Sequence, residues 1–237
     1  MIKQPENIFV VGTDTGVGKT VLSLLLMQFF YAKGYTPFYL KPVQTGCMDS
    51  NDIDSDARFI YKHVKHLKGK DPADSVIYCF KNPKAPYFAA RDEKKKIDLN
   101  VIEKVVNEKS LLFSPLVIEA AGGLLVPVSE KKLMVDMIKS ADARPVIAAR
   151  AELGTINHTL SAIESLGNRG IAPAGVVFID SGEKYTSKDM IKENIEAVER
   201  FSGIKVSGVI SKIQNFAKPG QDSYRVVENL FVSVLAG

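Results

Sequence analysis

The chain reads Ile8-Phe9-Val10-Val11-Gly12-Thr13-Asp14-Thr15-Gly16-Val17-Gly18-Lys19-Thr20 near its amino end. Four apolar residues predict a buried strand, a glycine-bearing loop follows, and a helical pattern continues to about Lys33. Strand, loop and helix in this order, with Gly-Lys-Thr where the helix starts, are the context of a phosphate-binding loop. Backbone N–H groups and the helix dipole at such a helix start attract anions. The stretch therefore predicts a nucleotide site.

The residues of this loop have separate expected roles. Gly16 and Gly18 allow the backbone to curl round a phosphate, Lys19 supplies a positive charge, and Thr20 offers a hydroxyl to Mg²⁺. The loop departs from G-x-x-x-x-G-K-[ST] in one respect, because its early glycine, Gly12, comes one residue sooner than usual. The residues expected to contact the nucleotide here are Gly16, Val17, Gly18, Lys19, Thr20 and Val21.

Length and composition are those of an ordinary soluble chain with one α/β domain. It has 237 residues, 46 % of them apolar and 24 % charged, and a formal net charge of +4, so we expect one domain over 1–237 and neither a nucleic-acid nor a membrane partner. No apolar run approaches the length of a membrane span, and the amino end does not read as a secretory signal. Cys47 and Cys79 have no metal-site spacing, which predicts reduced thiols and a cytoplasmic protein.

Apolar periodicity along the rest of the chain alternates between strand and helix patterns. We expect strands at 8–11, 37–40, 116–119, 145–149, 174–180 and 206–213, and helices at 20–33, 57–67, 98–109, 135–141, 154–167, 187–201 and 223–235. This alternation predicts a mainly parallel β-sheet with helices on both faces, the α/β fold of P-loop NTPases. Residues 68–97 are the hardest to interpret: 76–80 is a strand or an extended segment, and Pro83 and Pro86 are expected to prevent regular structure.

Charged residues follow two of these predicted strands. Lys41 comes directly after the second strand and Glu119 closes the fourth apolar run, so both are expected near the phosphate loop, where parallel strands end. Glu119 is a candidate metal ligand, although a charged strand end facing water is the alternative. Lys41 could equally be an exposed strand-end lysine. Asp56 could simply cap a helix.

A second glycine-led helix start occurs at Gly154-Thr155. It could bind an anion such as a carboxylate, or it could be ordinary capping. His158 in the same helix has no evident acidic partner, which favours an ordinary helical residue.

Taken together, these segments resemble dethiobiotin synthetases. The resemblance covers most of the chain and rests on Gly12–Thr20, on Lys41-Pro42-Val43 with Thr45-Gly46, on Asp56, on Glu119–Gly123 and on Leu153–His158. It implies a homodimeric, cytoplasmic, ATP-dependent cyclo-ligase of biotin synthesis. The reaction would close a ureido ring on 7,8-diaminononanoate with CO₂ (or bicarbonate) and release ADP and phosphate.

The resemblance also implies residue roles. Lys19 and Lys41 would be catalytic, and Thr20, Asp56 and Glu119 would bind Mg²⁺. Further nucleotide contacts would be Ala120, Ala121, Gly122, Ile179, Asp180, Ile210, Ser211 and Lys212. The substrate would contact Thr15, Lys41, Thr45 and Pro86, together with Leu153, Gly154, Thr155, Ile156 and Asn157, whose carboxylate-binding turn would come from the other subunit.

Two departures from the family pattern affect these expectations. Ala120 stands where a glycine is frequent, which requires that position to avoid dihedral angles that only glycine adopts. Ile179 stands where members often place an asparagine that pairs with adenine. We therefore expect loose base selection, with GTP or CTP working within about tenfold of ATP.

Three other classes fit the motifs less well. A partitioning or regulatory ATPase usually has a second lysine early in the loop, where this chain has Thr13-Asp14-Thr15. Such ATPases often carry a membrane-targeting terminal helix, whereas the tail of this chain, 226–237, has no basic face. An amidating synthetase of the cobyrinate type needs an added glutaminase domain, for which no room remains. A non-catalytic binding protein would not need the complete set of lysines and acids.

Overall fold

The computed structural model describes residues 6–181 and 186–235. Within these ranges, the strands form one sheet in the order β3-β2-β4-β1-β5-β6-β7, and every neighbouring pair is parallel. The strands are β1 (Asn7–Gly12), β2 (Phe38–Thr45), β3 (Val76–Phe80), β4 (Leu116–Gly123), β5 (Ala143–Arg150), β6 (Gly175–Ile179) and β7 (Val206–Ile210). The predicted parallel α/β fold is confirmed, and the uncertain segment 76–80 is a strand.

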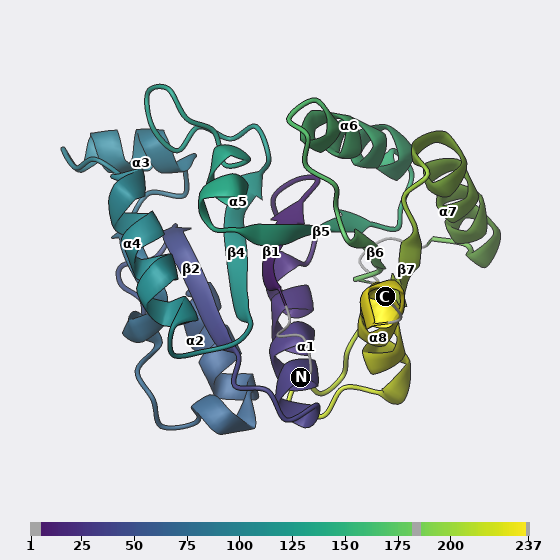
Figure 1. Cartoon of the computed structure of the whole chain (residues 1–237), viewed down its shortest axis with the longest axis horizontal. Helices are drawn as coiled ribbons and strands as arrows, with labels where there is room; N and C mark the ends of the chain where they lie inside the picture. The colour runs from purple at the N-terminus through teal and green to yellow at the C-terminus, as the bar shows by residue number, and fades with distance from the viewer. Residues whose placement is uncertain (1–5, 182–185, 236–237) are drawn as a thin grey trace.

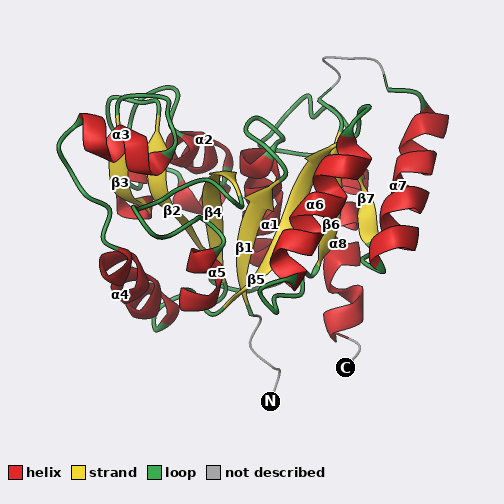
Figure 2. Cartoon of the chain, turned by 90° about the horizontal axis from the view of Figure 1, so that it is seen from above, coloured by secondary structure: helices red, strands yellow, loops and turns green. Residues whose placement is uncertain are grey.

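Helices pack on both faces of this sheet (Figures 1 and 2). They are α1 (Lys19–Ala32), α2 (Asp56–His63), α3 (Pro86–Asp92), α4 (Leu99–Ser110), α5 (Asp136–Ser140), α6 (Thr155–Gly167), α7 (Lys188–Ser202) and α8 (Gln221–Leu235). α1, α2 and α8 share one apolar core, and α4 to α7 pack on the other side. Central strand β1 serves both cores, because Ile8 and Val10 join the first while Phe9 and Val11 join the second.

The parallel arrangement determines where a ligand can bind. Carboxyl ends of neighbouring parallel strands lie at the same edge of the sheet, and ligands of open α/β sheets bind outside that edge. The phosphate loop leaves the end of β1, between β4 and β5. Side chains at the ends of β2, β4 and β6 can therefore approach it.

Two predictions about segments on the β2 side of the sheet are wrong. The helix expected over 57–67 ends at His63, because Val64 is extended and a separate 3-10 turn, Lys65–Leu67, follows. This break lets both Val64 and Leu67 point into the core beside α1. Pro86 does not prevent regular structure. It is the first residue of α3, where the missing N–H of proline would have no helical partner anyway.

Several strand ends also differ from the predictions. β4 continues past Glu119 to Gly123, and β7 ends at Ile210 rather than at residue 213. The residues after Ile210 therefore lie in a loop, where they line a cavity described below.

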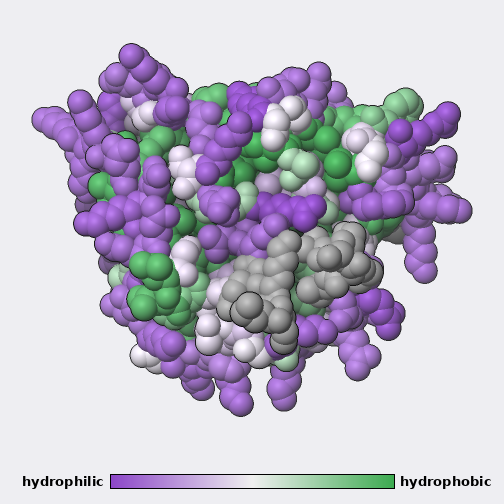
Figure 3. Space-filling view, viewed as in Figure 1, coloured by the Kyte–Doolittle hydropathy of each residue, from purple (hydrophilic) through white to green (hydrophobic). Residues whose placement is uncertain are grey.

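Hydrophilic residues cover most of the face seen in Figure 3, with smaller hydrophobic patches between them. Within the described part of the chain, no helix combines the length and the apolar character that crossing a membrane requires.

Candidate active site

The phosphate loop is held open at the start of α1. Gly18 is the N-cap residue of this helix with φ 91°, and Gly16 also has a positive φ of 69°. A Cβ on Gly18 would lie 2.6 Å from Cδ1 of Ile179, so both the backbone angle and the packing require glycine there. The first turn of α1 carries no acidic residue of its own, so its positive dipole end favours an anion.

The unusual position of Gly12 has a packing reason. A Cβ on Gly12 would lie 2.8 Å from the carbonyl oxygen of Asp14 and 2.8 Å from Cγ2 of Val17. The loop therefore folds back over the end of β1. Lys19 stabilises this turn, because its Nζ donates a hydrogen bond of 2.8 Å to the same Asp14 oxygen.

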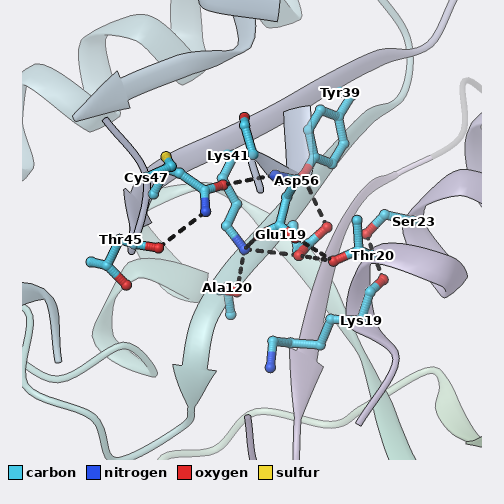
Figure 4. A network of polar contacts seen from close by, with 12 residues as sticks. Lys19, Thr20, Ser23, Tyr39, Lys41, Thr45, Cys47, Asp56, Glu119 and Ala120 are labelled. Carbon is cyan, nitrogen blue, oxygen red and sulfur yellow. Dashed lines mark hydrogen bonds and ion pairs between the residues drawn. The ribbon is translucent and has the colours of Figure 1, made fainter. Parts of the chain in front are cut away.

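Lys41 is the centre of a buried polar network (Figure 4). Only 4 % of the residue is exposed, and its Nζ lies 2.8 Å from Asp56 Oδ2, 2.8 Å from Glu119 Oε1 and 3.1 Å from the carbonyl oxygen of Ala120. The structure thus corrects the expected strand-end position: Lys41 lies inside β2, because that strand pairs with β4 up to Leu40 and then continues along β3.

The two acids of this network converge on Thr20. Its hydroxyl lies 2.8 Å from Asp56 Oδ1 and 2.9 Å from Glu119 Oε1. Asp56 is not the helix cap; Ser55 is, since its side chain accepts a hydrogen bond from the backbone N–H of Arg58. Glu119 does not face water either, because only 1 % of it is exposed. The alternative interpretations, a helix cap for Asp56 and a water-facing strand end for Glu119, are therefore wrong.

Burial and neighbouring charges set the ionisation of this network. Burial alone would lower the pKa of Lys41, but Asp56 and Glu119 outweigh it and raise that pKa above its usual value. Burial likewise opposes the charge of Asp56, yet Lys41 and Thr20 hold the Asp56 pKa below its usual value. Lys19 behaves differently: burial and the charge of Lys41 lower its pKa from 10.5 to about 8.

Two residues that the sequence analysis missed position the acids. The Tyr39 hydroxyl donates to Glu119 Oε2 at 2.9 Å, and burial together with Glu119 raises the pKa of this phenol well above its usual value. The Gln44 side chain accepts a hydrogen bond of 3.2 Å from the backbone N–H of Asp56. Both lie on β2, on either side of Lys41 in sequence, so their spacing from Lys41 was the one available signal.

Two cavities meet at the phosphate loop and share Gly16, Gly18, Val21 and Phe216. The first, of about 740 Å³, contains Lys19 and the Lys41 network; its other predicted residues are Thr15, Thr20, Thr45, Asp56, Pro86, Glu119, Ala121 and Gly122. The second, of about 530 Å³, contains Val17 and the predicted base-side residues Ile179, Asp180, Ile210, Ser211 and Lys212. A larger open hollow of about 1250 Å³ lies around Asn7 and Arg144, at the opposite edge of the sheet, and none of the predicted site residues line it.

Arg150 is a further cavity residue that the sequence analysis missed. It ends β5, and its guanidinium donates a hydrogen bond of 2.9 Å to the carbonyl oxygen of Thr15. Asp14 and Glu152 lie 3.7 and 3.8 Å from the same group. Its position after an apolar strand is the signal that also marked Glu119.

The turn at 153–157 does not join these cavities. Gly154 begins α6 with φ 94°, and Leu153 and Asn157 are exposed. Buried Thr155 turns inward and pairs with Thr159 at 3.3 Å. None of these residues lines either cavity of this chain. Exposed His158 in the same helix accords with the expected ordinary helical role.

The donor set fits Mg²⁺. Among the described residues, no group of three or more His, Cys, Asp and Glu side chains is arranged to hold a metal ion. The carboxylates of Asp56 and Glu119 and the hydroxyl of Thr20 do converge, and all three are oxygen donors. Mg²⁺ at phosphate sites takes one or two carboxylates and completes its shell with phosphate oxygens and water.

Comparison with known proteins shows what this chain is similar to in sequence. A family model described as an AAA domain matches residues 6–219. A protein of Hydrogenobaculum sp. named ATP-dependent dethiobiotin synthetase BioD is 39 % identical over 198 residues, which are 79 % of this chain and 86 % of that protein. The protein of the same name from Paramagnetospirillum magneticum is 37 % identical over 208 residues, 88 % of this chain and 89 % of its own.

The chain belongs to the dethiobiotin synthetase family. Members of this family are ligases, so the chain is an enzyme of that class. A Methanococcus vannielii protein of the same name is 30 % identical and is covered over 95 % of its length. The resemblance inferred from the motifs is thereby confirmed.

Solved structures confirm the fold independently. The MinC:MinD cell division protein complex of Aquifex aeolicus aligns with a TM-score of 0.61 at 14 % identity, covering 96 % of both chains. Cyanothece McdA aligns with a TM-score of 0.59 at 12 % identity, covering 98 % of this chain and 96 % of McdA. At such identities the likeness concerns the P-loop fold alone.

This synthetase-family chain tolerates Ala120 for a clear reason. Ala120 lies in β4, and the only non-glycine residues with positive φ in the described chain are Lys94 and Asp142. Its backbone needs no glycine, and its carbonyl oxygen is the third acceptor for Lys41.

Proposed function

We propose that the chain forms the ureido ring of dethiobiotin from 7,8-diaminononanoate and CO₂, using ATP and Mg²⁺. The observation that carries this proposal is the buried Lys41 network, which opens into a cavity continuous with the phosphate loop. The names of its relatives, ATP-dependent dethiobiotin synthetases, support the same reaction. We also propose that residues 1–237 act as one domain.

The two cavities suggest how the substrates are arranged. ATP would place its phosphates on the loop from Gly16 to Thr20 and its base in the cavity beside Ile179. The diamine would occupy the other cavity, whose walls include Thr15, Thr45 and Pro86. The phosphate loop borders both cavities, so this arrangement brings the γ-phosphate next to the diamine.

Asp56, Glu119 and Thr20 would hold Mg²⁺. The ion supplies neutralisation of the phosphate charge when it is bound. Lys41 now gives its three N–H bonds to Asp56, Glu119 and the Ala120 carbonyl. It must exchange at least one of these partners before it can contact a substrate oxygen. Its high pKa keeps it cationic throughout.

The reaction needs charge neutralisation more than proton transfer. A neutral amine of the substrate attacks CO₂ and loses a proton to water, giving an anionic carbamate. A carbamate oxygen attacks the γ-phosphorus and ADP leaves. The second amine then attacks the carbamoyl carbon and expels phosphate, which takes up the proton that this amine loses. Lys19 and Lys41 stabilise the anions in these steps, and no dedicated general base is required because the carbamate is already anionic.

We further propose a homodimer in the cytoplasm whose partner subunit supplies the turn at 153–157. In this arrangement the backbone N–H groups at the start of α6 would bind the substrate carboxylate. The exposure of Leu153 and Asn157 supports this proposal, because the turn is accessible to a second molecule.

Base selection is the finer part of the proposal. Ile179 packs against the phosphate loop beside Gly18 and offers the base an apolar surface rather than an amide. We expect GTP and CTP to support turnover within about tenfold of ATP, since an apolar wall discriminates weakly between bases. A nucleotide panel at fixed diamine measures this. A preference for ATP well beyond tenfold would contradict the proposed role of Ile179.

The decisive experiment measures phosphate release with ATP, Mg²⁺ and bicarbonate, with and without 7,8-diaminononanoate. We expect release that depends on the diamine, and a cyclic urea product by mass spectrometry. Lys41→Ala and Glu119→Ala should each lower the rate on the order of 100-fold or more. Lys84→Ala is the matched control, because Lys84 lines the same cavity but pairs with Asp92 at the surface. Hydrolysis of ATP that ignores the diamine would contradict the synthetase assignment and favour a switch ATPase.

A further inference from the structure

The chain contains two cysteines, and the fold brings them together. Cys47 follows β2 and Cys79 lies in β3, 32 positions later, yet their Sγ atoms are 3.3 Å apart. Neither cysteine is in a disulfide in this structure. Cys47 is buried with 4 % exposed, whereas Cys79 is partly accessible.

The pair lies where two walls of the cavity of about 740 Å³ leave the sheet. Cys47 lies two residues after Thr45, which belongs to one wall, and Cys79 precedes the segment that carries Pro83 and Pro86 in the other wall. Strand β3, which holds Cys79, is the edge strand of the sheet and pairs only with β2. An edge strand with one neighbour gains most from a covalent link.

We propose that Cys47 and Cys79 form a reversible disulfide site that reacts with small disulfides and ties these two walls together without reshaping the cavity. The thiol chemistry of this proposal does not depend on the proposed ligase reaction.

The backbone around the pair is already in place. The N–H of Gly46 donates to the carbonyl oxygen of Phe80 at 2.9 Å, and Gln44 lies opposite Cys79 in the β2–β3 register. A Cβ on Gly46 would lie 3.2 Å from Cβ of Pro83, so the walls are in close contact. Closing the Sγ–Sγ distance from 3.3 Å to about 2 Å is then a task for side-chain rotation.

The exchange proceeds in two balanced steps. The thiolate of partly accessible Cys79 attacks one sulfur of a small disulfide RSSR, and one RS⁻ leaves and takes up the proton that Cys79 lost. The Cys47 thiolate then attacks the Cys79 sulfur of the mixed disulfide and expels the second RS⁻, which takes up the Cys47 proton. The protein loses two protons and two electrons, and RSSR takes them up to become two RSH.

Burial raises the pKa of both thiols, and for Cys47 the contact with Cys79 raises it further. The thiolate is the attacking form, so oxidation should be slow at neutral pH and accelerate as the pH rises. Such a pair stays reduced under ordinary cytoplasmic conditions and oxidises only under sustained disulfide stress.

The test incubates the full-length protein with oxidised glutathione and follows it by intact-mass spectrometry. The wild type should lose about 2 Da and both thiols together, and reduced dithiothreitol should restore them. Cys47→Ser should stop at a mixed disulfide, about 305 Da heavier, because Cys79 has no resolving partner. Cys79→Ser should react far more slowly, because Cys47 is buried.

Two further readouts test the link itself. The disulfide closes a loop between positions 47 and 79, so the oxidised protein should melt about 5–10 °C above the reduced one. Diamine-dependent phosphate release should stay within about twofold of the reduced protein, because the cavity walls keep their positions. Three results would each overturn the proposal: the wild type accumulates the mixed disulfide, the two variants react at equal rates, or the oxidised protein loses diamine-dependent phosphate release.

Discussion

Two helices of this protein begin in the same way and end up with different surroundings. Gly18 starts α1 with φ 91°, and Gly154 starts α6 with φ 94°. Both N-cap residues are glycines without a capping side chain, and both first turns are free of acids. They follow β1 and β5, neighbouring strands of one sheet. Locally, each presents the positive end of a helix dipole.

The difference lies in what the rest of the chain puts around each turn. Gly18 is packed against Ile179, and Lys19 and the Lys41 network lie in the adjoining cavity. Gly154 has open space where its Cβ would be, and Leu153 beside it is 84 % exposed. A glycine-led helix start supplies directed N–H donors. Burial and added cations, which strengthen anion binding, come only from tertiary neighbours.

The first prediction tests this difference by placing the same methyl group on each turn. Gly18→Ala should lower ATP affinity on the order of 100-fold, because the methyl meets Ile179 and α1 must move. Gly154→Ala should leave ATP affinity unchanged and cost about 1 kcal/mol of unfolding free energy, from the positive φ alone. Calorimetric titration with ATP and urea unfolding measure the two effects. Equal losses of ATP affinity would show that the two turns are not distinct.

The open turn of α6 can be tested through the diamine. If a second molecule completes it, Asn157→Ala should raise KM for 7,8-diaminononanoate about tenfold while KM for ATP stays constant. His158→Ala, at the next exposed position of the helix, is the control and should change neither constant. The steady-state constants for both substrates provide the measurement. A shift in KM for ATP instead would place this turn at the nucleotide.

The third prediction concerns the charge of Lys19, which only the packed turn possesses. Its pKa of about 8 means that the free enzyme loses this charge between pH 7 and 9, so ATP affinity should fall about tenfold by pH 9. Lys19→Arg should bind ATP without this alkaline weakening, because arginine stays charged. ATP titrations at several pH values distinguish the two proteins, and parallel pH profiles would refute the assignment.

The contribution of Lys19 to folding stability should rise with pH, whereas ATP affinity falls. The unfolded lysine titrates near 10.5 and the folded one near 8, so the unfolded state binds more protons between these values. The contribution of Lys19 therefore makes the folded state more stable as pH rises through that window. It is constant well below pH 8, where Lys19 is protonated in both states.

The sequence analysis succeeded where the signal lies in a few consecutive residues and failed where it depends on contacts between distant residues. The phosphate loop is a continuous motif between two apolar segments, and its strand and helix were predicted correctly. Glu119 was found as a ligand candidate because it closes an apolar strand, whereas Asp56 became one only through the family resemblance; the structure brings both to Thr20. Tyr39, Gln44 and Arg150 were missed, because their hydrogen-bond partners are distant in sequence: the Glu119 side chain, the Asp56 backbone and the Thr15 backbone.

The sequence by itself determined the parallel α/β fold, the phosphate loop and the family, since apolar periodicity and contiguous motifs act over a few residues. Tertiary structure alone decided that Lys41 lies inside β2 between two acids, that Cys47 meets Cys79, and that Gly18 is enclosed while Gly154 is open. These outcomes depend on the order of strands in the sheet. That order reflects the packing of both apolar cores at once, which no single segment of the chain specifies.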